Sequence, residues 1–267
     1  MIRPLLHGAC ASIVLACIST PAPAASSEWV RAEGGAVRLV TEPGAGSDGK
    51  LRAALEIRLE PGWKTYWRDP GESGIPPMID VTFPEGPAQV EIGYPAPARF
   101  NDGYSTWVGY DGPVSLALSI DMPAGGRKLS ASVLVGICET ICIPLQADLS
   151  LELGAGNTER VDANLVETAF AKLPRRAGTT FRASLSEASE NRIIVEAHAP
   201  DAHDLTLFVA SSGDWLFGTP VPLGDGNSTA FEVPVFAAPD APSAPQIIHY
   251  VLATGDDAVA GTFEIAR

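Results

Sequence analysis

The sequence has 267 residues and a formal net charge of −14, from 18 Lys and Arg against 32 Asp and Glu. A chain of this length forms one large or two ordinary domains. The acidic balance excludes non-specific binding to nucleic acid or to an anionic membrane surface. The 26 Gly and 23 Pro punctuate short alternating runs, which favours an all-β fold over βαβ units.

The amino end has the pattern of a targeting segment. Arg3 gives a short positive start, residues 5–18 are mostly apolar, and Ala22, Pro23 and Ala24 form a small-x-small cleavage site. We therefore predict a cleaved signal peptide at residues 1–24 and a periplasmic location, where disulfides persist. No other stretch is apolar and long enough for a membrane span, so we expect no stable span in the mature chain.

The four cysteines fall into two groups. Cys10 and Cys17 lie in the predicted signal peptide, and residues 14–17 also match a lipoprotein processing site loosely, so a form lipid-anchored at Cys17 is an alternative. Cleavage leaves Cys138 and Cys142 as the only cysteines expected in the mature chain.

Residues 25–156 are predicted to form a first β-sandwich. Alternating runs at residues 36–40, 51–59 and 114–120 read as strands. The Cys-x3-Cys pair lies between an apolar β-branched run at 133–137 and a clean alternation at 145–151. This pattern is typical of a strand, a tight turn and a second strand.

The spacing of the cysteines constrains their geometry. Residues four apart in a straight strand lie roughly 13 Å from each other, whereas a disulfide needs Cα atoms about 4.4–6.8 Å apart. If Cys138 and Cys142 pair, residues 139–141 must turn the chain back at the neck of a hairpin. Such a small ring removes only about 2 kcal/mol of unfolded-state entropy. The pair is therefore a local staple or a redox dithiol, and its being the only expected pair favours the redox interpretation.

Residues 157–174 have apolar positions at helical spacing, with Pro174 closing the segment. We interpret them as a helical connector, with a helix packed inside one large domain as the alternative. Residues 175–267 repeat the β pattern without cysteines and are predicted to form a second immunoglobulin-like sandwich. The candidate strands there are residues 192–197, 205–210, 230–236, 247–253 and 258–265.

Two segments of the first half are rich in aromatic residues. Trp63, Tyr66 and Trp67 lie close together, and residues 97–107 combine three aromatics with a strong turn signal. Core packing is the usual role of such side chains in β domains. Aromatic side chains on a turn are costly to expose, however, unless they cover a reactive group or a partner's surface.

The order of these motifs resembles the amino-terminal periplasmic domain of the thiol:disulfide interchange protein DsbD family, in the branch of the copper-sensitivity suppressor type of membrane reductase. The segments that carry the resemblance are residues 63–67, 74–77, 94–100, 108–114 and 138–144. The similarity covers residues 29–153, and the region beyond Arg160 is similar to the second amino-terminal domain of that branch.

The resemblance implies an immunoglobulin-like sandwich whose cysteine pair passes electrons between a separate membrane electron-transfer protein and thioredoxin-like periplasmic proteins, without a cofactor other than the redox-active disulfide. Cys142 would form the mixed disulfide with the partner, and Cys138 would resolve it. The family's cap loop, which shields the pair, maps onto Phe100, Asn101, Asp102, Gly103 and Tyr104, with Phe100 or Tyr104 as the covering ring. We expect the frame of the site to comprise Tyr66, Trp67, Glu139 and Pro144.

Two features of this chain bear on that expectation. The three-residue spacing between its cysteines is shorter than in the best-known family members, and the sequence ends after the second sandwich.

No Lys, Arg or His lies within several residues of either cysteine. We therefore expect thiol pKa values near or above the ordinary value of about 8.5, and exchange that depends on a docked partner.

Two other functions use the same residues. A Cys-x3-Cys pair can hold Cu(I), although no Met or His lies at a telling spacing for a further ligand, so no metal site is predicted. The third possibility is a non-catalytic binding module with a structural disulfide.

Overall fold

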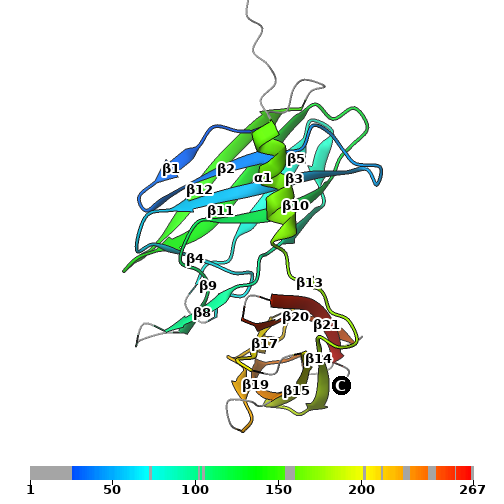
Figure 1. Cartoon of the computed structure of the whole chain (residues 1–267). Helices are drawn as coiled ribbons and strands as arrows, with labels where there is room; N and C mark the ends of the chain where they lie inside the picture. The colour runs from blue at the N-terminus through cyan, green and yellow to red at the C-terminus, as the bar shows by residue number, and fades with distance from the viewer. Residues whose placement is uncertain are drawn as a thin grey trace, which may run out of the picture.

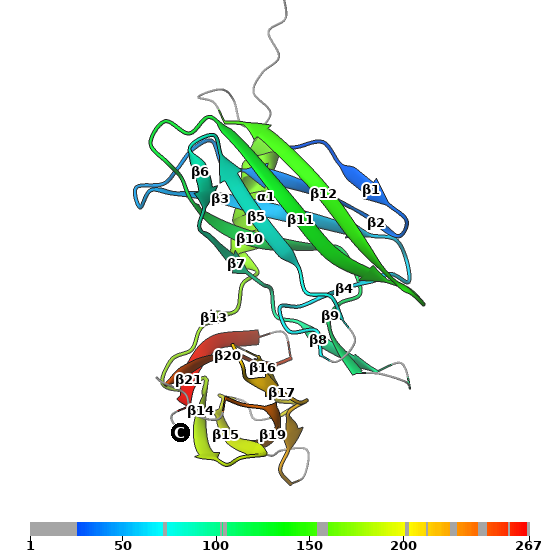
Figure 2. The ribbon, with the colours of Figure 1, turned by 180° about the vertical axis from the view of Figure 1, so that it is seen from behind.

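The computed structural model describes residues 26–71, 74–101, 103, 106–153, 160–200, 203–211, 213–224, 229–239, 245–255 and 257–265. The predicted signal peptide, with Cys10 and Cys17, lies outside these residues, as do Asp102 and Tyr104 of the predicted cap loop. The described chain forms two β-sandwiches and one helix (Figures 1 and 2). The predicted all-β, immunoglobulin-like fold is confirmed.

Two antiparallel sheets form the first sandwich. One has the order β1-β2-β3-β10-β7 and comprises β1 (Val30–Ala32), β2 (Gly35–Thr41), β3 (Lys50–Leu59), β7 (Val90–Gly93) and β10 (Val114–Asp121). The other has the order β6-β5-β11-β4-β9-β8, with β12 also paired to β11. Its strands are β4 (Lys64–Tyr66), β5 (Met78–Phe83), β6 (Gly86–Ala88), β8 (Ala98–Asn101), β9 (Thr106–Tyr110), β11 (Lys128–Cys138) and β12 (Cys142–Glu152).

The alternation of residues 145–151 places one face of β12 in the core. Leu145, Ala147, Leu149 and Leu151 are buried, and the residues between them are exposed. Facing side chains of the other sheet, such as Leu55 and Leu118, belong to the same hydrophobic cluster. The predicted face of this strand is therefore confirmed.

Helix α1 (Arg160–Ala171) lies across the outer face of β2, β3 and β10 (Figure 1). Val166 and Ala169 are buried against Val40, Ala54 and Ala117, and Phe170 and Leu173 pack at the margin of this cluster. The helix thus covers an apolar patch of the first sandwich and also leads the chain into the second.

The second sandwich has its own core, which includes Trp215 and Phe231. One sheet has the order β13-β21-β20-β16 and comprises β13 (Arg175–Arg176), β16 (Thr206–Ala210), β20 (Gln246–Thr254) and β21 (Asp257–Ile265). The other has the order β14-β15-β19-β17, with β18 also paired to β19. Its strands are β14 (Arg182–Ala188), β15 (Arg192–His198), β17 (Leu216–Phe217), β18 (Val221–Pro222) and β19 (Ala230–Ala237).

Side chains of the second sandwich complete the core of the first. Phe208, Ala210 and Val251, from β16 and β20, belong to the hydrophobic cluster of the first sandwich rather than to that of the second. The two sandwiches therefore share an apolar interface at the end where β4, β8 and β9 lie (Figure 2).

Candidate functional site

Strands β11 and β12 form a long antiparallel hairpin that ends in the cysteine pair. Their register runs without interruption from Lys128 opposite Glu152 to Cys138 opposite Cys142. The two cysteine Cα atoms are 4.2 Å apart and the sulfurs form a disulfide. The prediction that residues 139–141 turn the chain back, if the cysteines pair, is confirmed.

The two sulfur-bearing residues differ sharply in exposure. Cys138 is 2% exposed, because it lies in the interior of the sheet between β4 and β12. Cys142 is exposed, as are the three turn residues, and the side chain of Ile141 is 75% exposed. A macromolecule approaching the hairpin tip can therefore reach Cys142 but not Cys138.

The hydroxyl of Tyr66 is in direct contact with both sulfurs. Its hydroxyl oxygen lies 2.8 Å from Cys138 Sγ and 3.0 Å from Cys142 Sγ. The side chain is 2% exposed and comes from β4, which pairs with β11 on one side and with β9 on the other. Thr65, the preceding residue, fixes the strand by donating a hydrogen bond of 2.8 Å to the carbonyl of Gly136.

A row of aromatic side chains extends from the disulfide across the sheet. Trp107 of β9 meets Tyr66 edge to face with ring centroids 6.1 Å apart, and Phe100 of β8 stacks on Trp107 at 4.0 Å. Tyr66, Trp107 and Cys138 form one buried cluster with Phe100 at its margin. The ring of Phe100 is thus linked to the sulfurs through Trp107 and Tyr66.

Lys64 lies on the same strand and faces the same cluster. It is the register partner of Cys138, and its ammonium group lies 4.5 Å from the centroid of the Trp107 ring. The absence of cationic neighbours that we inferred from the sequence therefore applies along the chain only, because strand pairing brings a lysine opposite Cys138. Of the residues that the structure describes, Lys64 and Trp107 belong to the site but were not predicted in it, although both lie in the aromatic segments that the sequence analysis singled out.

The remaining predicted site residues lie in separate parts of the structure. Glu139 is exposed on the turn, and Pro144 is exposed on β12 opposite Gly136. Asn101 orders the described part of the cap loop: its side-chain oxygen accepts from the Gly103 amide at 2.7 Å, and its amide donates to the Thr106 hydroxyl at 3.1 Å. Trp67 packs against Phe208 of the second sandwich and is absent from the buried cluster that contains Cys138.

The segment that follows Tyr66 is held by the second sandwich. Trp67 is buried and meets Phe208 with ring centroids 6.1 Å apart. The Ser211 amide donates to Asp69 Oδ2 at 2.6 Å. Arg99, next to Phe100 on β8, donates to the Leu207 carbonyl at 2.9 Å. The second sandwich therefore contacts both chain segments that carry the aromatic row.

Charge at this junction is shielded from water. Burial lowers the pKa of Arg68, an effect that the phenols of Tyr94 and Tyr110 partly oppose. Burial also raises the pKa of Tyr94 and Tyr110. The pKa of His249 on β20 is lowered, first by burial and then by the charge of Arg68. The junction is thus a partly buried, cationic and aromatic environment in which a neutral His249 is favoured.

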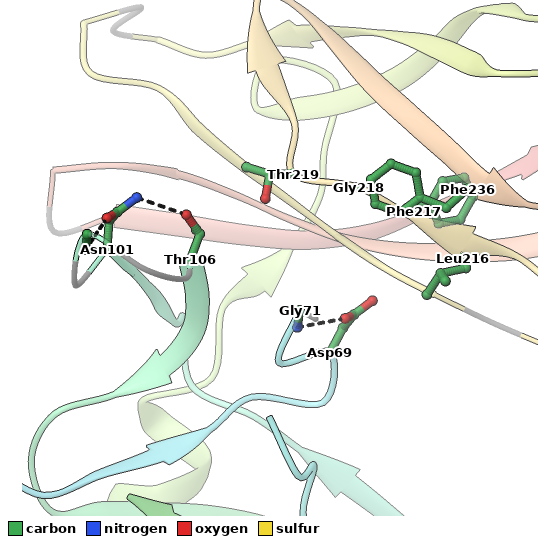
Figure 3. Close-up of a pocket in the computed structure, with 10 residues that line it drawn as sticks. Asp69, Gly71, Asn101, Thr106, Leu216, Phe217, Gly218, Thr219 and Phe236 are labelled. Carbon is green, nitrogen blue, oxygen red and sulfur yellow. Dashed lines mark hydrogen bonds between the residues drawn. The ribbon is translucent and has the colours of Figure 1, made fainter. Parts of the chain in front are cut away.

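A cleft of about 370 Å³ opens between the cap loop and the second sandwich (Figure 3). Asp69, Asn101 and Thr106 line one wall, and Leu216 and Phe236 line the other.

Within the described ranges, no group of three or more His, Cys, Asp or Glu side chains is arranged to hold a metal ion. Nor is any described helix long and apolar enough to cross a membrane.

Together, the fold and the site define an immunoglobulin-like β-sandwich with a partly accessible disulfide at a hairpin tip, an arrangement that fits thiol–disulfide exchange. Residues 36–153 match the family model described as "Thiol:disulfide interchange protein DsbD, N-terminal". This part of the chain is therefore a DsbD amino-terminal domain.

The structure is also similar to the crystal structure of the N-terminal periplasmic domain of ScsB from Proteus mirabilis, with a TM-score of 0.73 and 21% sequence identity. The similarity covers 91% of this chain and 99% of that one. At this level of identity it establishes the fold, including the succession of two sandwiches. The comparison with curated proteins gave no match.

Proposed function

We propose that this protein is a periplasmic thiol:disulfide interchange protein that passes electrons through Cys138 and Cys142, between a separate membrane reductase and thioredoxin-like proteins. The observation that carries the proposal is the unequal exposure of two cysteines in one disulfide. An exchange site needs one sulfur that a partner can attack and a second that remains shielded until it resolves the mixed disulfide. The family match and the signal-peptide pattern support the same function and location.

In this function two electrons move by two successive substitutions at sulfur. A partner's thiolate attacks Cys142 Sγ, the Cys138–Cys142 bond breaks, and Cys138 leaves as a thiolate. The partner's second thiolate then displaces Cys142 from the mixed disulfide, which leaves the pair reduced and the partner oxidised. The reverse sequence reduces a thioredoxin-like recipient. Cys142 attacks the recipient's disulfide and forms the mixed disulfide. Cys138 then attacks Cys142 Sγ, which re-forms the Cys138–Cys142 bond and releases the recipient in its reduced form.

The test replaces one cysteine at a time and measures the reactivity of the thiol that remains. We expect the Cys138→Ala variant, with Cys142 free, to form a mixed disulfide with a thioredoxin that has lost its second active-site cysteine and carries thionitrobenzoate on the first. The Cys142→Ala variant is the matched control, because its free thiol is the buried Cys138. We expect it to react at least about tenfold more slowly, since access limits exchange. Release of thionitrobenzoate gives both rates.

Equal rates for the two variants, or no adduct with Cys138→Ala, would contradict the proposal. Two further measurements on the unaltered chain separate the alternatives. A reduction potential well below about −300 mV would indicate a structural disulfide. Tight binding of one Cu(I) by the reduced protein alone, under anaerobic conditions, would indicate a copper-binding protein instead.

A further inference from the structure

The hydroxyl of Tyr66 lies within hydrogen-bond distance of both sulfurs of the disulfide, at 2.8 Å from Cys138 and 3.0 Å from Cys142. A disulfide sulfur carries no hydrogen, so the phenol is the donor in both contacts. It has one hydrogen and can give it to one sulfur at a time. The shorter contact is to Cys138, the buried member of the pair.

The position of this hydroxyl is fixed by its surroundings. Tyr66 is 2% exposed, and its backbone is hydrogen-bonded within a strand that has neighbours on both sides. Its ring and that of Trp107 meet edge to face. The ring also lies beside Gly136, where an added Cβ would come within 3.1 Å of Tyr66 Cδ2. The donor is therefore held in place before any reaction begins.

We propose that Tyr66 is a catalytic residue that stabilises the thiolate of Cys138 when this sulfur leaves the disulfide. The inference rests on the proposed exchange function and adds to it the group that makes the buried sulfur a competent leaving group. A charged thiolate is costly to form in a buried position without a hydrogen-bond donor. A donor already aimed at the atom where negative charge develops lowers the barrier without reorganisation.

The first exchange step balances in atoms and electrons. The attacking thiolate forms a new S–S bond to Cys142 Sγ, and the electron pair of the old bond departs on Cys138 Sγ. The Tyr66 O–H donates to that new lone pair and keeps its proton, since phenols as a class are weaker acids than thiols. In the reverse direction, the same hydrogen bond keeps Cys138 as the thiolate that attacks the mixed disulfide.

The test compares Tyr66→Phe with Tyr110→Phe. Both variants lose one hydroxyl in the same sheet, but that of Tyr110 donates to the Pro95 carbonyl and is not bonded to a sulfur. Each oxidised protein is reduced with excess dithiothreitol, and the rate is followed by quenched alkylation of the free thiols. We expect Tyr66→Phe to react about tenfold more slowly than the unaltered chain, the size typical of a lost hydrogen bond to a charged group. Tyr110→Phe should react at the unaltered rate.

A second readout separates catalysis from structure. In a Cys142→Ala background, only Cys138 titrates as a thiol, and its thiolate absorbance gives its pKa. We expect Tyr66→Phe to raise that pKa by about one unit, because the thiolate loses its donor. A slower reaction with an unchanged pKa would overturn the inference, since it would indicate displacement of the hairpin only.

The outcomes for the two proposals remain distinguishable. Equal reduction rates for Tyr66→Phe and the unaltered chain, with the unaltered pair readily reduced and active towards thioredoxin, would overturn the role of Tyr66 alone. A pair that dithiothreitol cannot reduce in the unaltered chain would overturn the exchange function itself. Circular dichroism of each variant checks that the sandwich is intact.

Discussion

Trp107 connects the cap loop to the strands that carry the sulfurs. Its indole contacts Tyr66 on one side and stacks on Phe100 on the other, and the Lys64 ammonium lies against the ring. Because Trp107 is 5% exposed, a movement of Phe100 at the end of β8 would change the surroundings of Tyr66 as well. Among the described residues, the aromatic contacts of the disulfide thus run as a continuous row from Tyr66 through Trp107 to Phe100.

Replacement of Phe100 by Ala tests how much of the covering of the disulfide comes from this side chain. We expect the free energy of unfolding in urea to fall by about 1–2 kcal/mol, from the lost aromatic pair and its partly buried area. We also expect dithiothreitol to reduce the disulfide faster. Phe236→Ala, which removes a 58% exposed ring of the second sandwich, is the control. An unchanged reduction rate would leave Tyr104 as the candidate for the covering ring.

The short strand β4 determines the geometry of the site. Glycines flank Tyr66 on both neighbouring strands: Gly109 is its register partner on β9, and the ring lies beside Gly136 on β11. A Cβ on Gly109 would come within 2.1 Å of the Thr65 carbonyl oxygen, and one on Gly136 within 2.8 Å of Ile75 Cβ. The close approach of β4 to β9 therefore depends on the missing side chain of Gly109, and Gly136 leaves the space that Ile75 and the Tyr66 ring occupy.

We expect Gly136→Ala to destabilise the protein by about 1–3 kcal/mol, the usual cost of overpacking a tight core. Because the added methyl also presses on Tyr66, reduction of the disulfide should slow as well. Gly112→Ala, at a site where a Cβ meets nothing within 4 Å, is the matched control. Chemical denaturation and the dithiothreitol rate are the two measurements. A variant as stable as Gly112→Ala would contradict this account of the strand contact.

The sequence predicted some of these elements and not others, for physical reasons. The hairpin around the cysteines is local: alternation at residues 145–151 and the reach of a disulfide determine its pairing. The neighbours of β11 on its other edge are set by long-range packing, so the proximity of Lys64 to Cys138 has no local signature. Tyr66 was predicted within the site frame, yet the contact of its hydroxyl with both sulfurs depends on that same long-range pairing. Trp67 was predicted beside it, but alternation along the chain turns it towards the domain junction.

Phe208 anchors the second sandwich to the first. It is 3% exposed, belongs to the hydrophobic cluster of the first sandwich, and meets Trp67 and the guanidinium of Arg99. Beside it, the Asp69 carboxylate accepts a hydrogen bond from the Ser211 amide, and the Arg99 guanidinium donates one to the Leu207 carbonyl. We infer that the two sandwiches unfold as one cooperative unit.

We expect Phe208→Ala to cost about 3–5 kcal/mol, as for other buried Phe residues, and to split thermal unfolding into two calorimetric transitions. Phe263→Ala removes a ring from the core of the second sandwich instead, so it should destabilise without uncoupling. A single transition in Phe208→Ala, merely shifted in temperature, would contradict the anchoring role of this residue.

The contacts of the second sandwich with residues 67–69 determine which shortened forms of this chain keep the site intact. The family match ends at residue 153, yet Phe208, which covers Trp67, and the Ser211 amide bonded to Asp69 both lie beyond that boundary. A fragment trimmed to the match would expose an indole one residue from Tyr66 and leave that end of β4 without its support. The smallest fragment suited to redox measurements therefore includes the second sandwich and is longer than the segment that matches the family.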